Sequence, residues 1–430
     1  MSTNNDTLIC ALKSLPLVLA VAAASSASFA LDLSATAGLQ AEHSDNMTKA
    51  PDNKRSDLKS TVSASVNAEH EGEKVKVDLS YSAARSSYQQ DSFDDETRVN
   101  GSGSVVYEQI DQQLIWTLEN SRKNVIKNKA LNDVEDNRED RSISSARVDF
   151  IMRPSSVDSL TFSPSYTDIK YEDTDNQDSG RIGGRINWTR ALSKIDRVGL
   201  QVSYDDVTFD SDLFDYEYYL YTVNYQASLS KLSYSITAGM NESKRTNDDY
   251  DGQYFKANAN YKVSRSLFSL DVLQELTDTS RGTNNEGLSE NSSDFEEVDV
   301  FERSSIEISY QSEGLCNSCT LDLSLMYEDE NYETLPRDND EIRLNTRLSY
   351  QWSRLISWDL GLIWQDVSFS NQALVQSDYE SLVYRAALRW QLVEKLSAGF
   401  YIAYEDKEFD TEDRDYDELK GGVNLTYSFD

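Results

Sequence analysis

The chain has 430 residues, with 41 Lys and Arg against 75 Asp and Glu, so its formal net charge is −34 at pH 7. A soluble protein of this length would contain two or three domains, but the sequence lacks the apolar stripes of helix bundles and the continuous Val/Ile/Leu runs of doubly wound α/β folds. Its 25 Tyr, 14 Phe and 6 Trp disfavour disorder, and its acidity argues against a nucleic-acid partner. What remains is a large β structure with a wet interior.

Residues 1–30 are typical of a secretory signal peptide. The apolar run 15–24 is followed by Ser-Phe-Ala at 28–30, which has small residues at the positions of a cleavage site. A transmembrane anchor is the alternative, but the run is shorter than the ~20 apolar residues that a helical span needs. The mature chain is therefore expected to begin near Leu31 and to leave the cytoplasm.

Beyond the leader the dominant pattern has a period of two. Between 342 and 352, Ile, Leu and aromatic side chains alternate with Arg, Asn, Ser and Gln, and the segments 232–241 and 75–83 alternate in the same way. This pattern places apolar side chains on one face of a strand and polar ones on the other. We predict about twenty strands, with 18 as the alternative, near 31–43, 57–69, 75–88, 98–107, 112–121, 141–152, 158–171, 181–189, 196–209, 216–228, 232–243, 252–263, 266–276, 298–311, 319–330, 341–352, 357–369, 379–392, 396–406 and 416–429.

The connections between these strands alternate in length. After even-numbered strands they are short, as at 71–74 and 229–231, and after odd-numbered strands they are longer and acidic, as at 44–56, 122–140 and 277–297. Outer-membrane barrels of bacteria have short periplasmic turns and longer outer loops. We therefore predict an all-β fold, a single transmembrane antiparallel up-and-down β-barrel over residues 31–430. The two longest connections, 122–140 and 277–297, are candidates for loops that fold into the lumen.

The two faces of the predicted strands fit a membrane barrel. Strands can span lipid only as a closed ring, because every backbone amide must be paired internally. The outer face must be apolar, since a cation facing the middle of the bilayer costs ~2–4 kcal/mol. The face of 342–352 that contains Leu344 and Leu348 carries no charge. The polar face would be costly in a dry core, so we expect it to line a water-filled lumen.

Aromatic residues gather near the predicted strand ends, as in the aromatic girdles of membrane proteins. The set beside the short turns is Trp116, Trp188, Tyr225, Tyr261, Trp352, Trp358 and Trp390. The set toward the long connections is Tyr88, Tyr171, Tyr204, Tyr219, Tyr327, Tyr332 and Tyr379.

The end of the chain resembles a known family. The segments 382–390 (Leu-Val-Tyr-Arg-Ala-Ala-Leu-Arg-Trp) and 396–406 are followed by Asp-Tyr-Asp at 415–417 and by a last strand that closes on Phe429. This stretch resembles the β-barrel porins encoded with exopolysaccharide biosynthesis genes. The resemblance implies an integral conduit of the Gram-negative outer membrane for export of a secreted polysaccharide. The residue pattern by itself indicates only a pore-sized barrel, so a general or substrate-selective porin for small hydrophilic solutes is the alternative.

These interpretations define the expected partners. Outer-membrane lipid and lipopolysaccharide would surround the barrel, and a polysaccharide or a small hydrophilic solute would occupy its lumen. Periplasmic export components are further candidates. No nucleic acid and no cofactor are expected.

The predicted lumen face carries seven arginines. Members spaced i, i+4 on one strand stay on the same face, about 13 Å apart. Such rows set the selectivity of a pore and can hold anionic groups bidentately. The candidate pore-lining residues are Arg147, Arg181, Arg185, Arg343, Arg347, Arg385 and Arg389. The alternative is a static network with the lumen acids Asp78, Asp149, Asp322 and Asp359. Tyr401 shares this face and can stack on sugar rings.

Cysteine and acidic motifs offer little further chemistry. Cys316 and Cys319 form a CxxC pair, which predicts a small disulfide closing a turn, with a redox motif or half of a zinc site as alternatives. The segment 173–180 is similar to the start of a calcium loop, but Gly184 stands where the bidentate Glu should be. We therefore predict no metal site and interpret the segment as a solvated outer loop, with loose Ca²⁺ or Mg²⁺ binding as the alternative.

No catalytic constellation is evident, and we do not expect an enzyme. The only histidines are His43 and His70, which are expected to be polar residues at strand ends. Asp205 and Asp206 are candidates for general acid/base work, but 75 acidic residues make such a pair expected by chance.

Overall fold

The computed structural model describes residues 31–128, 131–210, 214–245, 248–279, 299–370, 377–410 and 412–429. The predicted leader over 1–30 lies outside this part of the chain. Within it, no helix is long and apolar enough to cross a bilayer. The short 3-10 helices that lie wholly within the described residues are η1 (Glu135–Asn137), η2 (Asp175–Gln177) and η5 (Glu412–Arg414).

The described residues contain twenty strands, which confirms the predicted set with ends shifted by a few residues. Their bounds are β1 (Asp32–Ser44), β2 (Asp57–Glu71), β3 (Val75–Tyr88), β4 (Glu96–Ile110), β5 (Leu114–Ile126), β6 (Arg138–Met152), β7 (Asp158–Tyr171), β8 (Ser179–Ala191), β9 (Asp196–Phe209), β10 (Tyr216–Ser228), β11 (Leu232–Arg245), β12 (Asp249–Val263), β13 (Ser266–Asp278), β14 (Val300–Ser312), β15 (Cys319–Tyr332), β16 (Asn339–Gln351), β17 (Ile356–Phe369), β18 (Tyr379–Val393), β19 (Leu396–Phe409) and β20 (Tyr416–Phe429).

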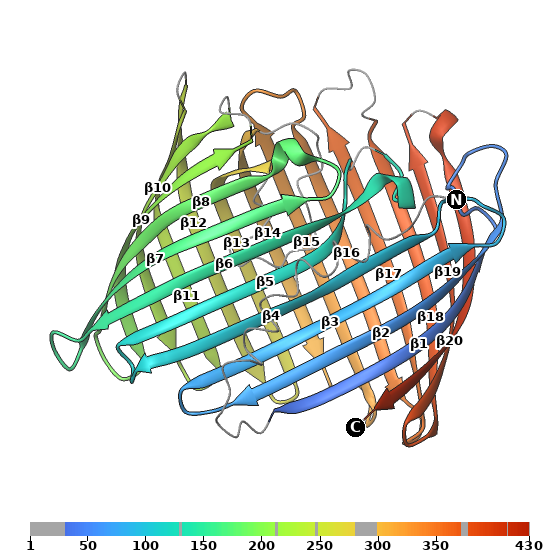
Figure 1. The fold of residues 1–430 in the computed structure, drawn as a ribbon, viewed down its shortest axis with the longest axis horizontal. Helices are drawn as coiled ribbons and strands as arrows, with labels where there is room; N and C mark the ends of the chain where they lie inside the picture. Colours follow the sequence, from blue (N-terminus) through green and yellow to red (C-terminus); the bar gives the residue numbers. More distant parts are fainter. Residues whose placement is uncertain are drawn as a thin grey trace, which may run out of the picture.

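The strands form one closed antiparallel barrel. Each pairs with its neighbours in sequence, and β1 pairs with β20, from Ala35 opposite Phe429 to Ser44 opposite Lys420. This seam pairs the two strands that would otherwise be edges, which is what a ring in lipid requires. Figure 1 shows the strands running obliquely around the barrel. The predicted all-β barrel is confirmed, with twenty strands rather than eighteen.

The two ends of the barrel differ, as the connection lengths predicted. Short turns such as 264–265 and 394–395 follow even-numbered strands, and longer connections such as 127–137 follow odd-numbered ones. The connection 246–248 after β11 is an exception. In Figure 1 the 3-10 helices lie along the upper rim, with the longer connections. We call this rim the loop end and the opposite rim the turn end.

The outward face carries an apolar belt, which is clear across β14 to β17. In register across β14 to β17, Ile308 lies opposite Leu325, Leu325 opposite Leu344, and Leu344 opposite Trp364. The exposed fractions of Ile308 and Leu325 are 55% and 47%. Neighbouring exposed apolar side chains on this scale mark a surface that another apolar phase covers. The belt has the character that hydrocarbon contact requires.

The inward face is polar over most of its height and becomes buried toward the loop end. Three apolar clusters lie there, of which the first contains Val367, Phe369, Tyr379, Phe409 and Tyr416, the second contains Val207, Phe209, Tyr216, Tyr218 and Leu220, and the third contains Val125, Ile169 and Tyr171. Because all these strand segments lie beside long connections, the lumen is most densely filled at its loop-end mouth.

The predicted aromatic girdle is confirmed at the turn end and partly wrong at the loop end. Trp116, Tyr261, Trp352 and Trp390 are exposed, with Trp352 at 68%. Tyr88, Tyr171 and Tyr379 are instead buried, at 5–8% exposure. Their place in the register explains the difference, because these three tyrosines lie on the inward face and pack at the mouth.

A charge in the apolar belt is expected to prevent assembly. We predict that Leu325→Arg lowers the yield of folded barrel severalfold, because a cation facing lipid costs about 2–4 kcal/mol at the midplane. The matched control is Ser324→Arg, one residue earlier and facing the lumen. Heat-modifiable gel migration of membrane-extracted protein measures closure. Equal yields of the two variants would show that Leu325 does not face lipid.

Candidate functional site

All seven predicted arginines lie on the inward face. Arg347, Arg385 and Arg389 line a cavity of about 1320 Å³. Arg147, Arg181 and Arg185 line a second cavity of about 490 Å³. Arg343 lies closer to the loop end, where its guanidinium contacts the Glu341 carboxylate at 2.6 Å. The predicted arginines therefore lie in two separate cavities and at the loop-end mouth.

Both interpretations of the arginines apply, each to part of the set. Four form ion pairs, namely Arg147 with Asp149 at 3.3 Å, Arg181 with Asp278 at 2.9 Å, Arg343 with Glu341 at 2.6 Å and Arg347 with Asp359 at 3.0 Å. In the described part of the chain, Arg185, Arg385 and Arg389 form no ion pair. The paired arginines have a structural partner, whereas Arg385 and Arg389 are exposed to the lumen.

The wall of the larger cavity contains a basic row. In register from β16 to β20, Arg347 lies opposite Gly361, Gly361 opposite Arg385, Arg385 opposite Ala403, and Ala403 opposite Lys420. Neighbouring strands are about 4.8 Å apart, so Gly361 separates two guanidinium-bearing positions without filling the space between them. We call Arg347, Arg385, Arg389 and Lys420 the basic wall.

Tyr401 lies across the inner surface beside the basic wall. Its hydroxyl donates to the Glu42 carboxylate and accepts a hydrogen bond from Gln40 Nε2 at 3.2 Å. A Cβ at Gly422 would lie 2.6 Å from the Tyr401 ring, so the ring can cross β20 only because position 422 is glycine. The Arg385 guanidinium stands 5.0 Å from the ring centroid, an attractive cation–π arrangement.

Sequence reasoning singled out Tyr401 but missed Glu42, Gln40 and Gly422. The available signal was the pair Gly421-Gly422 in the last strand, because glycine inside a strand often marks a close approach of another group. The partner that approaches could not be read from the sequence, since it requires β19, β20 and β1 to be adjacent.

The connection 127–137 folds into the mouth from one side. Asn132 Nδ2 donates to the Lys49 carbonyl at 2.9 Å. The carboxylate of Glu135 lies 2.9 Å from Arg98 Nη2 and 3.5 Å from Lys59 Nζ. Arg98 lies on β4, beside β5, and Lys59 lies on β2, so the loop between β5 and β6 reaches along the inner surface as far as β2. One predicted candidate for an inward loop is confirmed.

The loop-end part of β13 enters the mouth from the other side. Pairing with β12 stops at Gln274, after which the Leu276 carbonyl accepts a hydrogen bond from Asn241 Nδ2 at 2.8 Å. A Cβ at Gly252 would lie 2.8 Å from Leu276, so glycine permits this close approach. The start of the second candidate connection, 277–279, thus lies inside the barrel, while 280–298 lies outside the described residues.

A buried ion pair fixes β13 at this place. Arg181 Nη2 contacts the Asp278 carboxylate at 2.9 and 3.0 Å, and the Tyr216 hydroxyl donates to it at 2.5 Å. The side chains of Arg181 and Asp278 are 5% and 1% exposed. Because Arg181 lies on β8 and Asp278 on β13, this contact joins strands that are distant around the ring.

Asp133 helps to hold the other inward loop. Burial raises the pKa of this carboxyl group, but the hydrogen bond from Arg138 Nη2 at 2.7 Å and the charges of Lys49 and Lys420 outweigh it. The pKa therefore lies below its ordinary value of 3.8. The stabilisation from this contact is complete above pH 3.8 and is lost as the pH falls through the lower folded-state value.

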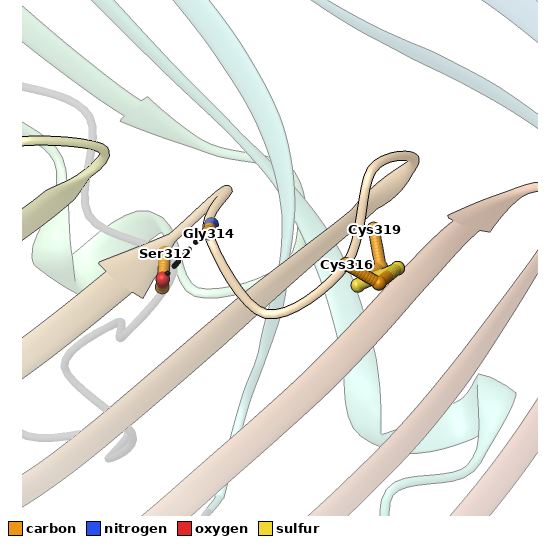
Figure 2. Close-up of a disulfide and its surroundings, with 4 residues drawn as sticks. All are labelled: Ser312, Gly314, Cys316 and Cys319. Atoms are coloured by element: carbon orange, nitrogen blue, oxygen red, sulfur yellow. Dashed lines mark hydrogen bonds between the residues drawn. A yellow bond between two sulfur atoms is a disulfide. The ribbon is translucent and has the colours of Figure 1, made fainter.

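The cysteines lie at the turn end, Cys316 in the connection 313–318 and Cys319 at the start of β15. Figure 2 shows the disulfide between Cys316 and Cys319 and the hydrogen bond of 3.1 Å that the Gly314 amide donates to Ser312 Oγ. The structure thus places the predicted disulfide in a turn.

The remaining motifs do not assemble into a reaction centre. In the described ranges no group of three His, Cys, Asp or Glu side chains could hold a metal ion. In the calcium-like segment 173–180, Asp178 accepts hydrogen bonds of 2.8 Å from Lys170 Nζ and from the Tyr171 amide. Asp205 and Asp206 are consecutive on β9 and face opposite sides of the wall, so they cannot act as an acid/base pair.

Comparisons with known proteins find similar barrels among solved structures. No family model and no curated protein matches the chain. Among solved structures, the FrpB iron transporter of Neisseria meningitidis is 8% identical with a TM-score of 0.49, over 93% of this chain and 82% of that one. The outer membrane protein OpdK of Pseudomonas aeruginosa is 8% identical with a TM-score of 0.42, over 93% and 99%. OmpT of Vibrio cholerae is 9% identical with a TM-score of 0.39, over 94% and 99%. Similarity at this level carries no information about the substrate.

Loss of the buried ion pair is expected to open the mouth. We predict that Asp278→Ala raises single-channel conductance and current noise, because removing one partner of a buried pair costs about 3–5 kcal/mol and releases β13 from Arg181. The control is Asp271→Ala, on the same strand but exposed toward the turn end. If Asp278→Ala forms a heat-modifiable barrel with wild-type conductance, the ion pair between Arg181 and Asp278 does not hold β13 in the mouth.

Acid is expected to release the loop that contains Asp133. We predict an increase in conductance below pH 3.8, since protonation of Asp133 removes its negative charge and weakens its contact with Arg138. In Asp133→Asn the negative charge is absent at every pH, so the channel should be noisy already at neutral pH and should lack the increase below pH 3.8. An identical increase in conductance below pH 3.8 in both proteins would show that groups other than Asp133 cause it.

Proposed function

We propose that the chain forms a pore for hydrophilic solutes in the bacterial outer membrane. One observation carries this proposal: the closed ring is apolar outside and polar inside, around a cavity of about 1320 Å³. An apolar exterior suits hydrocarbon, and a polar interior with exposed arginines suits water.

The location rests on three features of the chain. The leader pattern of residues 1–30 would direct export, and the last strand closes on Phe429, as in the assembly signal of outer-membrane barrels. The difference between loop end and turn end matches the orientation of such barrels, with turns in the periplasm. Lipid and lipopolysaccharide would then surround the apolar belt.

Small hydrophilic solutes are the first candidate cargo. The mouth is narrowed from two sides, by the connection 127–137 and by the end of β13. A narrow mouth above a wide basin suits molecules that pass singly, whereas a continuous polymer chain would require both segments to move aside.

Polysaccharide export is the second candidate, favoured by a specific observation. Tyr401 presents an aromatic surface beside Arg385 in the lumen, and residues 382–430 resemble the porins encoded with exopolysaccharide genes. In that case periplasmic export components would be partners. We propose no catalytic function and no cofactor for either case.

Conductance and a gene deletion test these functions. Purified protein in planar bilayers should give discrete, ion-conducting channels, and liposomes containing it should swell in small sugars. A protein that inserts as a heat-modifiable barrel but conducts no ions would contradict the pore. Deletion of the gene separates the two cargoes: loss of extracellular polysaccharide with normal solute uptake would favour export, and the reverse result would favour the small-solute pore.

A further inference from the structure

The loop-end part of β12 has a strand partner on one side only. Its pairing with β11 continues to Asp249. Its pairing with β13 stops at Phe255, opposite Gln274. In the described part of the chain no other strand pairs with residues 249–254 on the side of β13. Unpaired N–H and C=O groups make such an edge a template for another strand, so the ladder of β12 is incomplete here.

The end of β13 lies behind β12, inside the barrel. Leu276 shares a strand face with Leu270, which is 39% exposed on the outside of the barrel, yet Leu276 is 1% exposed. It lies against Gly252, on the face of β12 that carries the cavity-lining Lys256. The lipid-side face of β13 therefore packs on the lumen side of β12. We call residues 275–278, which overlap the wall from within, the β13 flap.

Contacts with three other strands hold the β13 flap in this inward position. The Leu276 carbonyl accepts a hydrogen bond of 2.8 Å from Asn241 on β11. The Asp278 carboxylate contacts Arg181 on β8 at 2.9 Å and accepts a hydrogen bond of 2.5 Å from the Tyr216 hydroxyl on β10. These contacts take the place of the ladder bonds that the end of β13 does not form with β12.

The same residues of β13 have a second set of partners in β12. Continuing the present register beyond its last pair places Leu276 opposite Gln253 and Asp278 opposite Asp251. Leu276 would then face outward, as Leu270 does, and the ladder between the two strands would be complete. The two carboxylates would be directly opposite each other and would repel. This repulsion favours the inward position, in which Asp278 has a cationic partner.

We propose that the β13 flap is a gate with two positions. In the inward position, which the structure shows, it narrows the mouth. In the wall position it pairs with β12, returns to the ring and leaves the mouth wider. Each position satisfies polar groups that the other leaves without their partner: the inward position pairs Asp278, and the wall position pairs the edge of β12. This inference rests on the proposed pore function and names an element that controls the pore.

Two substitutions are expected to move the flap into the wall without removing its ion pair. In Gly252→Ala the added Cβ would lie 2.8 Å from the Leu276 Cβ, so it collides with the flap in the inward position. Asp251→Lys turns the repulsion with Asp278 into an attraction that exists only in the wall position. Such a change should shift the ratio of wide to narrow conductance states in planar bilayers about fivefold or more.

The matched control is Glu408→Lys. It makes the same charge change at an exposed residue near the loop end of β19, whose pairing with β18 is complete at that end. The ratio of conductance states should stay at its wild-type value. Heat-modifiable migration confirms that each variant forms a barrel.

A disulfide detects the wall position without any measurement of conduction. Gln253→Cys and Leu276→Cys together place two thiols directly opposite each other in the wall position, whereas the β12 backbone lies between them in the inward position. The control pair is Gln253→Cys with Thr277→Cys. Because the control side chains point to opposite faces of the sheet, the first pair should cross-link about tenfold more efficiently. Mass spectrometry of the oxidised, membrane-extracted full chain measures both yields.

The cross-linked barrel should stay in the wide conductance state, and a reductant should restore the wild-type ratio. Wild-type protein in the same reductant is the control for the native disulfide, which lies at the turn end.

The outcomes separate the gate from the proposed function. Conducting channels in which the first pair cross-links no better than the control pair would overturn the wall position and leave the pore standing. Cross-linked channels with wild-type conductance would overturn the gate. Efficient cross-linking of the first pair in a barrel that conducts no ions would overturn the pore and leave the two positions of the flap.

Discussion

The structure depends on the requirement that every backbone N–H and C=O group in lipid has a partner inside the protein. A sheet meets this requirement only when its first and last strands pair, as β1 and β20 do. Closure in turn fixes the direction of each side chain, because successive residues alternate between lipid and lumen. The period-two pattern that dominates the sequence is the direct consequence.

Closure also explains why a membrane protein can be so acidic and so poor in apolar residues. Only the outward half of each strand needs to be apolar, and the inward half meets water, so 38% apolar residues and a net charge of −34 are compatible with a membrane barrel. A ring of twenty strands is too wide for its side chains to fill. The interior consequently holds cavities rather than a core, and its burial is concentrated where chain segments fold inward.

The sequence predicts what depends on neighbours along the chain and fails where strands meet around the ring. The twenty strands, their inward arginines and the CxxC turn follow from local spacing. The contact of Tyr401 with Glu42 joins residues 359 positions apart and exists only because the seam brings β19, β20 and β1 together. The inward direction of Tyr88 and Tyr379 was missed for a related reason, since tyrosine suits both a lipid interface and a buried mouth.

Whether a charged side chain in the lumen needs an ion-pair partner depends on its access to water. At the mouth, Arg181 and Asp278 are almost fully buried, so each requires the other, and their pairing fixes the position of β13. In the wider basin, Arg385 and Arg389 remain hydrated, so neither needs an internal partner. A charge that is stable in water without a protein partner is one that a passing anion can bind without first breaking an ion pair. The width of the barrel thus determines where arginine holds the structure together and where it can meet a solute.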